Sequence, residues 1–167
     1  MIAAYVSLGS NVGDGRANLE NALAALPDCG CEPIRASSVY ETEPQGDQDQ
    51  PWFANQVVQV NCPATLRPEI FLGRLLSLEN KLGRIRDLNQ RFGPRLIDLD
   101  LLLFGNLISG QETVPDLILP HYRLKERAFV LVPLQEISPG IILPDGQSVE
   151  ALLERLPHKV VGYRIFQ

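Results

Sequence analysis

The sequence has few cysteines and no long hydrophobic run. Its three cysteines, Cys29, Cys31 and Cys62, are an odd number at irregular spacing, which supports neither a disulfide framework nor a zinc site. The longest apolar runs, such as 101–104, are far too short to cross a bilayer. Residues 1–6 lack the basic region that precedes the apolar part of a signal peptide. These absences predict a protein of the reducing cytoplasm, without a membrane partner.

Positive charge is also scarce. The chain holds 15 Lys and Arg against 20 Asp and Glu, and its net charge of −5 argues against a broad nucleic-acid footprint. Four of the cations nevertheless crowd one short stretch: Arg84, Arg86, Arg91 and Arg95. Guanidinium groups fork onto phosphate oxygens and keep their charge, so this cluster indicates a small polyanionic ligand. A solvated, salt-bridged loop is the alternative.

The rest of the composition fits one folded domain over residues 1–167. Hydrophobic residues make up 45% and charged residues 21%, and no repeat or linker divides the chain. Strands are expected over 3–8, 32–41, 53–61 and 95–104, and helices over 14–26, capped by Asp14, and from Thr65 to about Leu82. This βαββαβ order predicts an α+β, ferredoxin-like core: an antiparallel sheet with both helices on one face. A C-terminal extension is expected to add helices over 125–136 and 148–156 and an edge strand over 160–166.

Two acidic residues mark the strand that follows the arginines. Asp98 and Asp100 are two apart, so their side chains share one face of a strand. Paired carboxylates can hold two hard cations about 3.5–4 Å apart, as in two-metal phosphoryl-transfer sites. An arbitrary Asp-x-Asp is more often a solvated strand face. Here the neighbours are apolar and Arg95 lies just upstream, and carboxylates in such surroundings need a cationic partner, which favours a metal site.

Other segments carry weaker signals. Phe53 and Asn55 share a strand face and could stack on a flat heterocycle and hydrogen-bond its edge, although phenylalanine at a strand start is usually core. His121 and Tyr122 could contact phosphate or ribose, and a structural histidine is the alternative. The glycine-rich stretch 9–15 lacks the Lys-Ser/Thr ending of a Walker A loop, so it indicates a turn and a helix cap.

Together these segments resemble the 6-hydroxymethyl-7,8-dihydropterin pyrophosphokinase family, nearly end to end. The resemblance is carried by Ala4–Asn11, Thr42–Gly46 with Gln48–Pro51, Glu79 with Gly83–Arg86, Arg91–Leu102, Pro120–Tyr122 and Arg127–Phe129. The run from Arg91 to Leu102 is long and highly specific. The resemblance implies transfer of pyrophosphate from MgATP to the hydroxymethyl group of a reduced pterin, with release of AMP.

The resemblance also implies roles for individual residues. Asp98 and Asp100 would bind two Mg²⁺ ions, and Arg84 and Arg95 would hold the phosphates and act in catalysis. The remaining ATP contacts would come from Glu79, Leu101, His121, Tyr122 and Arg127. The pterin would lie between Phe53 and Phe129, bonded to Asn55 and to groups around Thr42 and Gln45. The chain departs from common family residues at Gln45, Phe53, Leu76 and Phe92.

Three further expectations follow. The arginine-rich segment 83–92 should be mobile without ligand and should close when both substrates bind, because its like charges repel each other. The protein should act as a monomer on small molecules, without nucleic acid. Two rivals stay open: another ATP-dependent transferase that uses the same acidic strand, and an RNA-binding module on a ferredoxin-like sheet. Net acidity and the lack of an aromatic RNP-like strand count against the second rival.

Overall fold

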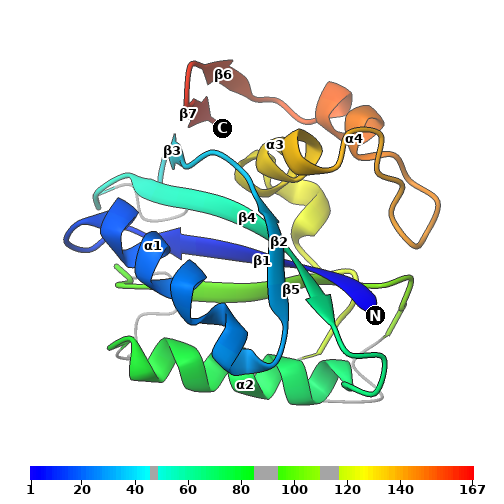
Figure 1. Ribbon diagram of the computed structural model, residues 1–167. Coiled ribbons are helices and arrows are strands. Elements are labelled where there is room, and N and C mark those ends of the chain that lie inside the picture. The colour runs from blue at the N-terminus through cyan, green and yellow to red at the C-terminus, as the bar shows by residue number, and fades with distance from the viewer. Residues whose placement is uncertain (46–48, 85–93, 110–116) are drawn as a thin grey trace.

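The computed structural model describes residues 1–45, 49–84, 94–109 and 117–167. These residues form one sheet with helices packed on it (Figure 1). The described strands are β1 (Ile2–Ser10), β2 (Glu32–Ala36), β3 (Tyr40–Thr42), β4 (Phe53–Cys62), β5 (Asp98–Phe104), β6 (Lys159–Val161) and β7 (Arg164–Phe166). They follow the order β5-β1-β4-β3-β7-β6, and β2 also pairs with β4. All neighbours are antiparallel except β3 and β7, which are parallel.

Helices cover both faces of the sheet. The described helices are α1 (Gly15–Ala25), α2 (Pro68–Lys81), α3 (Ala128–Ile137) and α4 (Val149–Arg155), with short 3-10 turns at Leu26–Cys29 and Leu124–Glu126. Alternate residues of β4 divide between two cores. Val58 and Val60 pack with α1 and α2, whereas Val57 packs with α3 on the opposite face. The expected pair of helices does share one face, and the C-terminal extension supplies a third layer (Figure 1).

Several expected boundaries were wrong for identifiable reasons. The strand expected over 32–41 is divided into β2 and β3. The division lies at Ser37, whose hydroxyl accepts the Val57 N–H at 3.0 Å in place of a backbone carbonyl. Helix α2 begins at Pro68 and not after Thr65, because proline suits the first helical position, where no N–H is needed. The strand expected over 160–166 is a hairpin, with Gly162 at a φ of 57° in its turn.

Strand β5 begins three residues later than expected. Arg95 pairs instead with the turn after β1: its N–H donates to Asn11 Oδ1 at 2.8 Å, and its carbonyl accepts the Asn11 N–H at 3.0 Å. Asp14 caps α1 as predicted, accepting the Ala17 N–H at 3.1 Å. The chain that follows the arginine-rich segment is therefore anchored at Arg95 to the turn after β1.

The expectation that the cysteines stay unpaired was also wrong. Cys31 and Cys62 form a disulfide, with their Cα atoms 4.5 Å apart, while Cys29 is a buried free thiol. The pairing of β2 with β4 explains this contact, because Glu32 lies opposite Asn61 and the next residues outward are the two cysteines. Sequence spacing alone does not reveal such a register. In the described part of the chain, no helix has the length and apolar character needed to cross a bilayer.

Candidate active site

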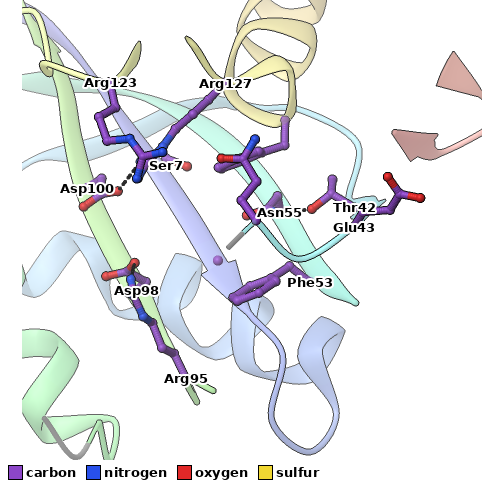
Figure 2. A pocket seen from close by; sticks show the side chains of 13 residues that line it. Ser7, Thr42, Glu43, Phe53, Asn55, Arg95, Asp98, Asp100, Arg123 and Arg127 are labelled. Carbon is purple, nitrogen blue, oxygen red and sulfur yellow. Dashed lines mark hydrogen bonds and ion pairs between the residues drawn. The ribbon is translucent and has the colours of Figure 1, made fainter. Parts of the chain in front are cut away.

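A pocket opens beside β1, β4 and β5, between β3 and the first turn of α3 (Figure 2). Its lining joins two kinds of side chain, charged groups at one end and aromatic and amide groups at the other. The lining residues are Ser7, Gly9, Thr42, Glu43, Gln45, Phe53, Asn55, Arg95, Asp98, Asp100, Arg123, Arg127 and Phe129. Segments far apart in the sequence thus meet at one cavity.

Asp98 lies at the start of β5 between two arginines. Arg84 Nη1 contacts Asp98 Oδ1 at 2.5 Å, and Arg95 pairs with the other carboxylate oxygen. Burial works to raise the pKa of Asp98, but Arg95 and Arg84 outweigh it and the pKa is lowered. Asp98 therefore stays ionised and pairs with two guanidinium groups.

Asp100 lies on the same face of β5 and behaves differently. Burial and the neighbouring charge of Asp98 raise its pKa to about 6, although Arg127 opposes the shift. Arg127 Nη1 lies 3.2 Å from Asp100 Oδ2 (Figure 2). The buried Nε of Arg127 has no hydrogen-bond partner among the described residues. The Asp100 carboxylate at this end of the pocket could therefore bind another cation. The Nε–H of Arg127 could donate a hydrogen bond to a ligand.

Glu79, on α2, holds the strand β5 that carries the two aspartates. Its side chain, on α2, is 1% exposed, and Oε1 accepts the N–H of Leu99 at 2.7 Å, between the two aspartates. The same oxygen lies 2.6 Å from Arg84 Nη1. Glu79 therefore fixes the backbone of β5 and the position of Arg84 together. It does not line the pocket, so its place indicates support more than direct contact with a ligand.

The aromatic end of the pocket is lined by two phenylalanines and an amide. Phe53 and Asn55 share one face of β4, as predicted, and Phe129 lies on the first turn of α3. Asn55 Nδ2 donates to Thr42 Oγ1 at 2.6 Å, and both groups are buried (Figure 2). Gly9 pairs with Asn55 across the strands, and a Cβ at Gly9 would meet the Asn55 oxygen at 3.0 Å. The lack of a side chain at Gly9 therefore leaves room for the Asn55 amide.

The remaining predicted residues lie near the pocket without lining it. His121 and Tyr122 stack with ring centroids 4.7 Å apart, and His121 Nδ1 accepts the Arg123 N–H at 3.2 Å. Burial and the nearby Arg127 lower the pKa of His121 to about 4. Tyr122 is exposed, whereas the Leu101 side chain lies in the core with α1 and α2. Leu101 can therefore offer the pocket its backbone more readily than its side chain.

Some lining residues were missed by the sequence analysis. Ser7 and Gly9 of β1 lie opposite Asp100 and Asp98, so the pairing of β1 with β5 was the signal that could have found them. Glu43 and Arg123 each adjoin a residue that was predicted. Arg86, Arg91 and Phe92, with nearly all of the predicted mobile segment 83–92, lie outside the described residues.

The acidic pair suits magnesium better than a metal held by protein alone. Within the described ranges, no cluster of three or more His, Cys, Asp and Glu side chains could hold an ion. Mg²⁺ typically takes one or two carboxylates and completes its shell with water and substrate phosphates. Asp98 and Asp100 on one strand face, beside arginines suited to phosphate, fit that pattern.

Comparison with known proteins gives a consistent result. The family model for 7,8-dihydro-6-hydroxymethylpterin-pyrophosphokinase (HPPK) matches residues 5–139. The chain is 43% identical over 160 residues to the 2-amino-4-hydroxy-6-hydroxymethyldihydropteridine pyrophosphokinase of Methylorubrum extorquens, covering 93% of this chain and 94% of that protein. It is 40% identical over 156 residues to the enzyme of the same name from Pseudomonas aeruginosa, covering 92% and 91%.

Solved structures show the same fold at much lower identity. The wild-type HPPK-DHPS of Plasmodium falciparum matches with a TM-score of 0.68 and 14% identity, over 93% of this chain and 43% of that longer one. The family model covers more than half of the chain, and the two bacterial relatives match it nearly end to end. The chain therefore belongs to the 7,8-dihydro-6-hydroxymethylpterin-pyrophosphokinase family.

Proposed function

We propose that this protein transfers a pyrophosphoryl group from MgATP to the hydroxymethyl group of 6-hydroxymethyl-7,8-dihydropterin, in folate biosynthesis. The observation that carries the proposal is the composition of the pocket. One cavity joins Asp98, Asp100 and their arginines to Phe53 and Asn55. A polyanion and a flat heterocycle can therefore bind side by side, as a transfer between them requires.

At the charged end of the pocket, the negative and positive side chains neutralise each other when no ligand is bound. Three carboxylates, on Glu79, Asp98 and Asp100, face three guanidinium groups, on Arg84, Arg95 and Arg127. Asp98 and Asp100 would hold two magnesium ions, which supply Lewis-acid neutralisation of the phosphate oxygens. The arginines then turn from the aspartates to the triphosphate, where they stabilise the charge that develops in the transition state. The unpartnered Nε of Arg127 is one donor ready for this exchange.

The remaining nucleotide contacts come from the segment before α3, from β5 and, indirectly, from α2. His121 stays neutral at physiological pH because its pKa is lowered, so it can donate or accept a hydrogen bond without adding charge. The exposed ring of Tyr122 and the backbone of Leu101 complete the ATP side, and Glu79 acts there through Arg84.

The aromatic end suits a pterin. Phe53 and Phe129 would stack on the two faces of the ring, and Asn55 would hydrogen-bond its amide-like edge. The hydrogen bond from Asn55 Nδ2 to Thr42 fixes the orientation of the amide. Its second N–H and its oxygen can then hydrogen-bond the pterin ring. Gln45 also lines this end.

The reaction needs no covalent intermediate with the protein. The pterin hydroxyl oxygen attacks the β-phosphorus of ATP, and the bond from that phosphorus to the α–β bridging oxygen breaks. The bond electrons leave with AMP, and the hydroxyl proton is released. Positioning and charge stabilisation are sufficient for such a transfer.

We also propose the finer assignments that accompany this function. The order β5-β1-β4-β3, with both early helices on one face, supports the ferredoxin-like description. The protein would act as a monomer in the cytoplasm, where the Cys31–Cys62 disulfide would be open to reduction. Gel filtration with light scattering and cell fractionation test these two assignments.

Product analysis tests the function. The protein is incubated with ATP, magnesium and 6-hydroxymethyl-7,8-dihydropterin, and nucleotides are separated by ion-exchange chromatography. AMP should form in equal amount to the pterin diphosphate, and only when the pterin is present. Formation of ADP would support the rival transferase and contradict the proposal.

A further inference from the structure

Residues 164–167 consist of β7 and Gln167, and we call them the β7 segment; β7 lies beside β3 (Figure 1). The segment is not part of the pocket lining, but it contacts chain on both sides of the pocket. On one side the segment extends the sheet. Glu41 and Thr42 of β3 pair in parallel with Arg164 and Ile165. The Glu43 N–H continues this contact by donating to the Ile165 carbonyl at 3.4 Å. The strand that carries Thr42 is thus held from its outer edge.

On its other side the β7 segment holds the start of α3. Ile165 is 1% exposed and packs in one cluster with Tyr40 and Ala128, against which the Phe129 side chain also packs. Gln167 Oε1 accepts the Ala128 N–H at 2.8 Å, and Gln167 Nε2 donates to the Glu126 carbonyl at 2.7 Å. The N-cap residue Arg127 makes no side-chain capping bond, so Gln167 supplies the acceptor that the first turn lacks.

Gln167 also reaches the opposite side of the pocket. Its backbone N–H donates to Glu43 Oε2 at 3.2 Å. Glu43, which follows β3, lines the cavity on one side, and Arg127 and Phe129, at the start of α3, line it on the other. One residue outside the lining therefore ties the two sides together.

A third contact concerns the neighbour of Phe53. The ring of Phe166 meets Trp52 edge-on with centroids 5.3 Å apart, and the Arg164 guanidinium lies 5.6 Å from the Trp52 centroid. Arg164 also bonds Glu41 at 2.8 Å. Trp52 directly precedes Phe53, so the β7 segment contacts the residue next to Phe53 and, through Ile165, the cluster against which Phe129 packs.

We propose that the β7 segment is a positioning element for the heterocycle site, and that Gln167 is its principal positioning residue. It sets the distance between the Glu43 side and the Arg127–Phe129 turn, so that the two aromatic rings are spaced for one flat ligand. This inference rests on the proposed function, because it takes the ligand between Phe53 and Phe129 to be the pterin. Aromatic stacking depends steeply on spacing, so a loosened turn should weaken binding without unfolding the protein.

The test compares Gln167→Ala with wild type by calorimetry, titrating the pterin into protein saturated with magnesium and a non-hydrolysable ATP analogue. Loss of two side-chain hydrogen bonds should weaken pterin binding by about five- to tenfold. The melting midpoint should fall by only about 2–6 °C, because the two hydrogen bonds are worth about 1–2 kcal/mol and Gln167 contributes little buried apolar area. The matched control is Lys159→Ala, an exposed residue of the same hairpin on β6, which should bind the pterin as wild type does.

Two results would overturn the inference. One is a Gln167→Ala protein that binds the pterin within twofold of wild type. The other is a loss of affinity matched by a melting shift large enough to unfold much of the protein at the titration temperature, which would make the role purely structural. The wild-type titration reports on the proposed function separately, because wild-type protein that fails to bind pterin would contradict that function whatever the variant does.

Discussion

Glu79 offers the most direct test of how the acidic strand is held. Its carboxylate is 1% exposed and accepts both the Leu99 N–H at 2.7 Å and Arg84 Nη1 at 2.6 Å. We consider Glu79→Ala, which removes both contacts, and Glu79→Gln, which keeps an oxygen for Leu99 but removes the charge. The comparison separates the backbone contact from the ion pair.

The size of each effect follows from the burial of the partners. In Glu79→Ala the Leu99 N–H loses this acceptor and Arg84, whose side chain is 13% exposed, loses one carboxylate. Breaking a buried pair of this kind should lower the free energy of unfolding by about 3–5 kcal/mol. Because Arg84 retains Asp98, the lower end is expected. Glu79→Gln should cost about 1–2 kcal/mol, because the hydrogen bond to Leu99 survives.

Urea denaturation followed by far-UV circular dichroism measures these differences. Glu20→Ala, on the exposed side of α1, is the matched control and should change the stability by less than about 0.5 kcal/mol. A Glu79→Ala protein within about 1 kcal/mol of wild type would be far less destabilised than the loss of a buried ion pair requires. That result, or equal losses in the Gln and Ala variants, would mean that the carboxylate does not hold β5 and Arg84 as described.

Three further predictions concern the pocket. Asp98→Ala or Asp100→Ala should reduce turnover by on the order of a thousandfold while circular dichroism stays unchanged, and near-normal magnesium-dependent rates would refute the metal assignment. Phe53→Ala should weaken pterin binding by about 1–3 kcal/mol in calorimetry and leave ATP binding nearly unchanged; equal losses for both ligands would contradict a pterin-specific role. The pKa of His121 is about 4 when folded, below its ordinary 6.5, so the unfolded chain binds more protons between these values. Stability should therefore fall as pH drops from about 6.5 to about 4, by at most about 3 kcal/mol, and His121→Gln should flatten that part of the curve.

Local patterns predicted most elements of the fold. The two-residue period placed Asp98 with Asp100 and Phe53 with Asn55 on shared strand faces, and both pairs do line the pocket. The Asp14 cap also formed as expected. These features depend on neighbours in sequence, so the sequence carries them directly.

The features that sequence analysis missed depend on register between distant strands. The pairing of β2 with β4 brings Cys31 to Cys62, and the pairing of β1 with β5 brings Ser7 and Gly9 to the pocket. The parallel pairing of β3 with β7, which brings Gln167 to α3, has no local signature at all. The motifs therefore placed Asp98, Asp100, Phe53 and Asn55 at the site, whereas the positions of Ser7, Gly9 and Gln167 required the structure.

Isotope transfer can show whether the pterin hydroxyl attacks the β-phosphorus of ATP. ATP carrying ¹⁸O in the α–β bridging position is turned over with magnesium and 6-hydroxymethyl-7,8-dihydropterin, and the products are examined by ³¹P NMR and mass spectrometry. Attack at the β-phosphorus leaves the label on AMP and yields an unlabelled pterin diphosphate. Label in released pyrophosphate would show attack at the α-phosphorus, label in ADP would show attack at the γ-phosphorus, and either result would contradict the account.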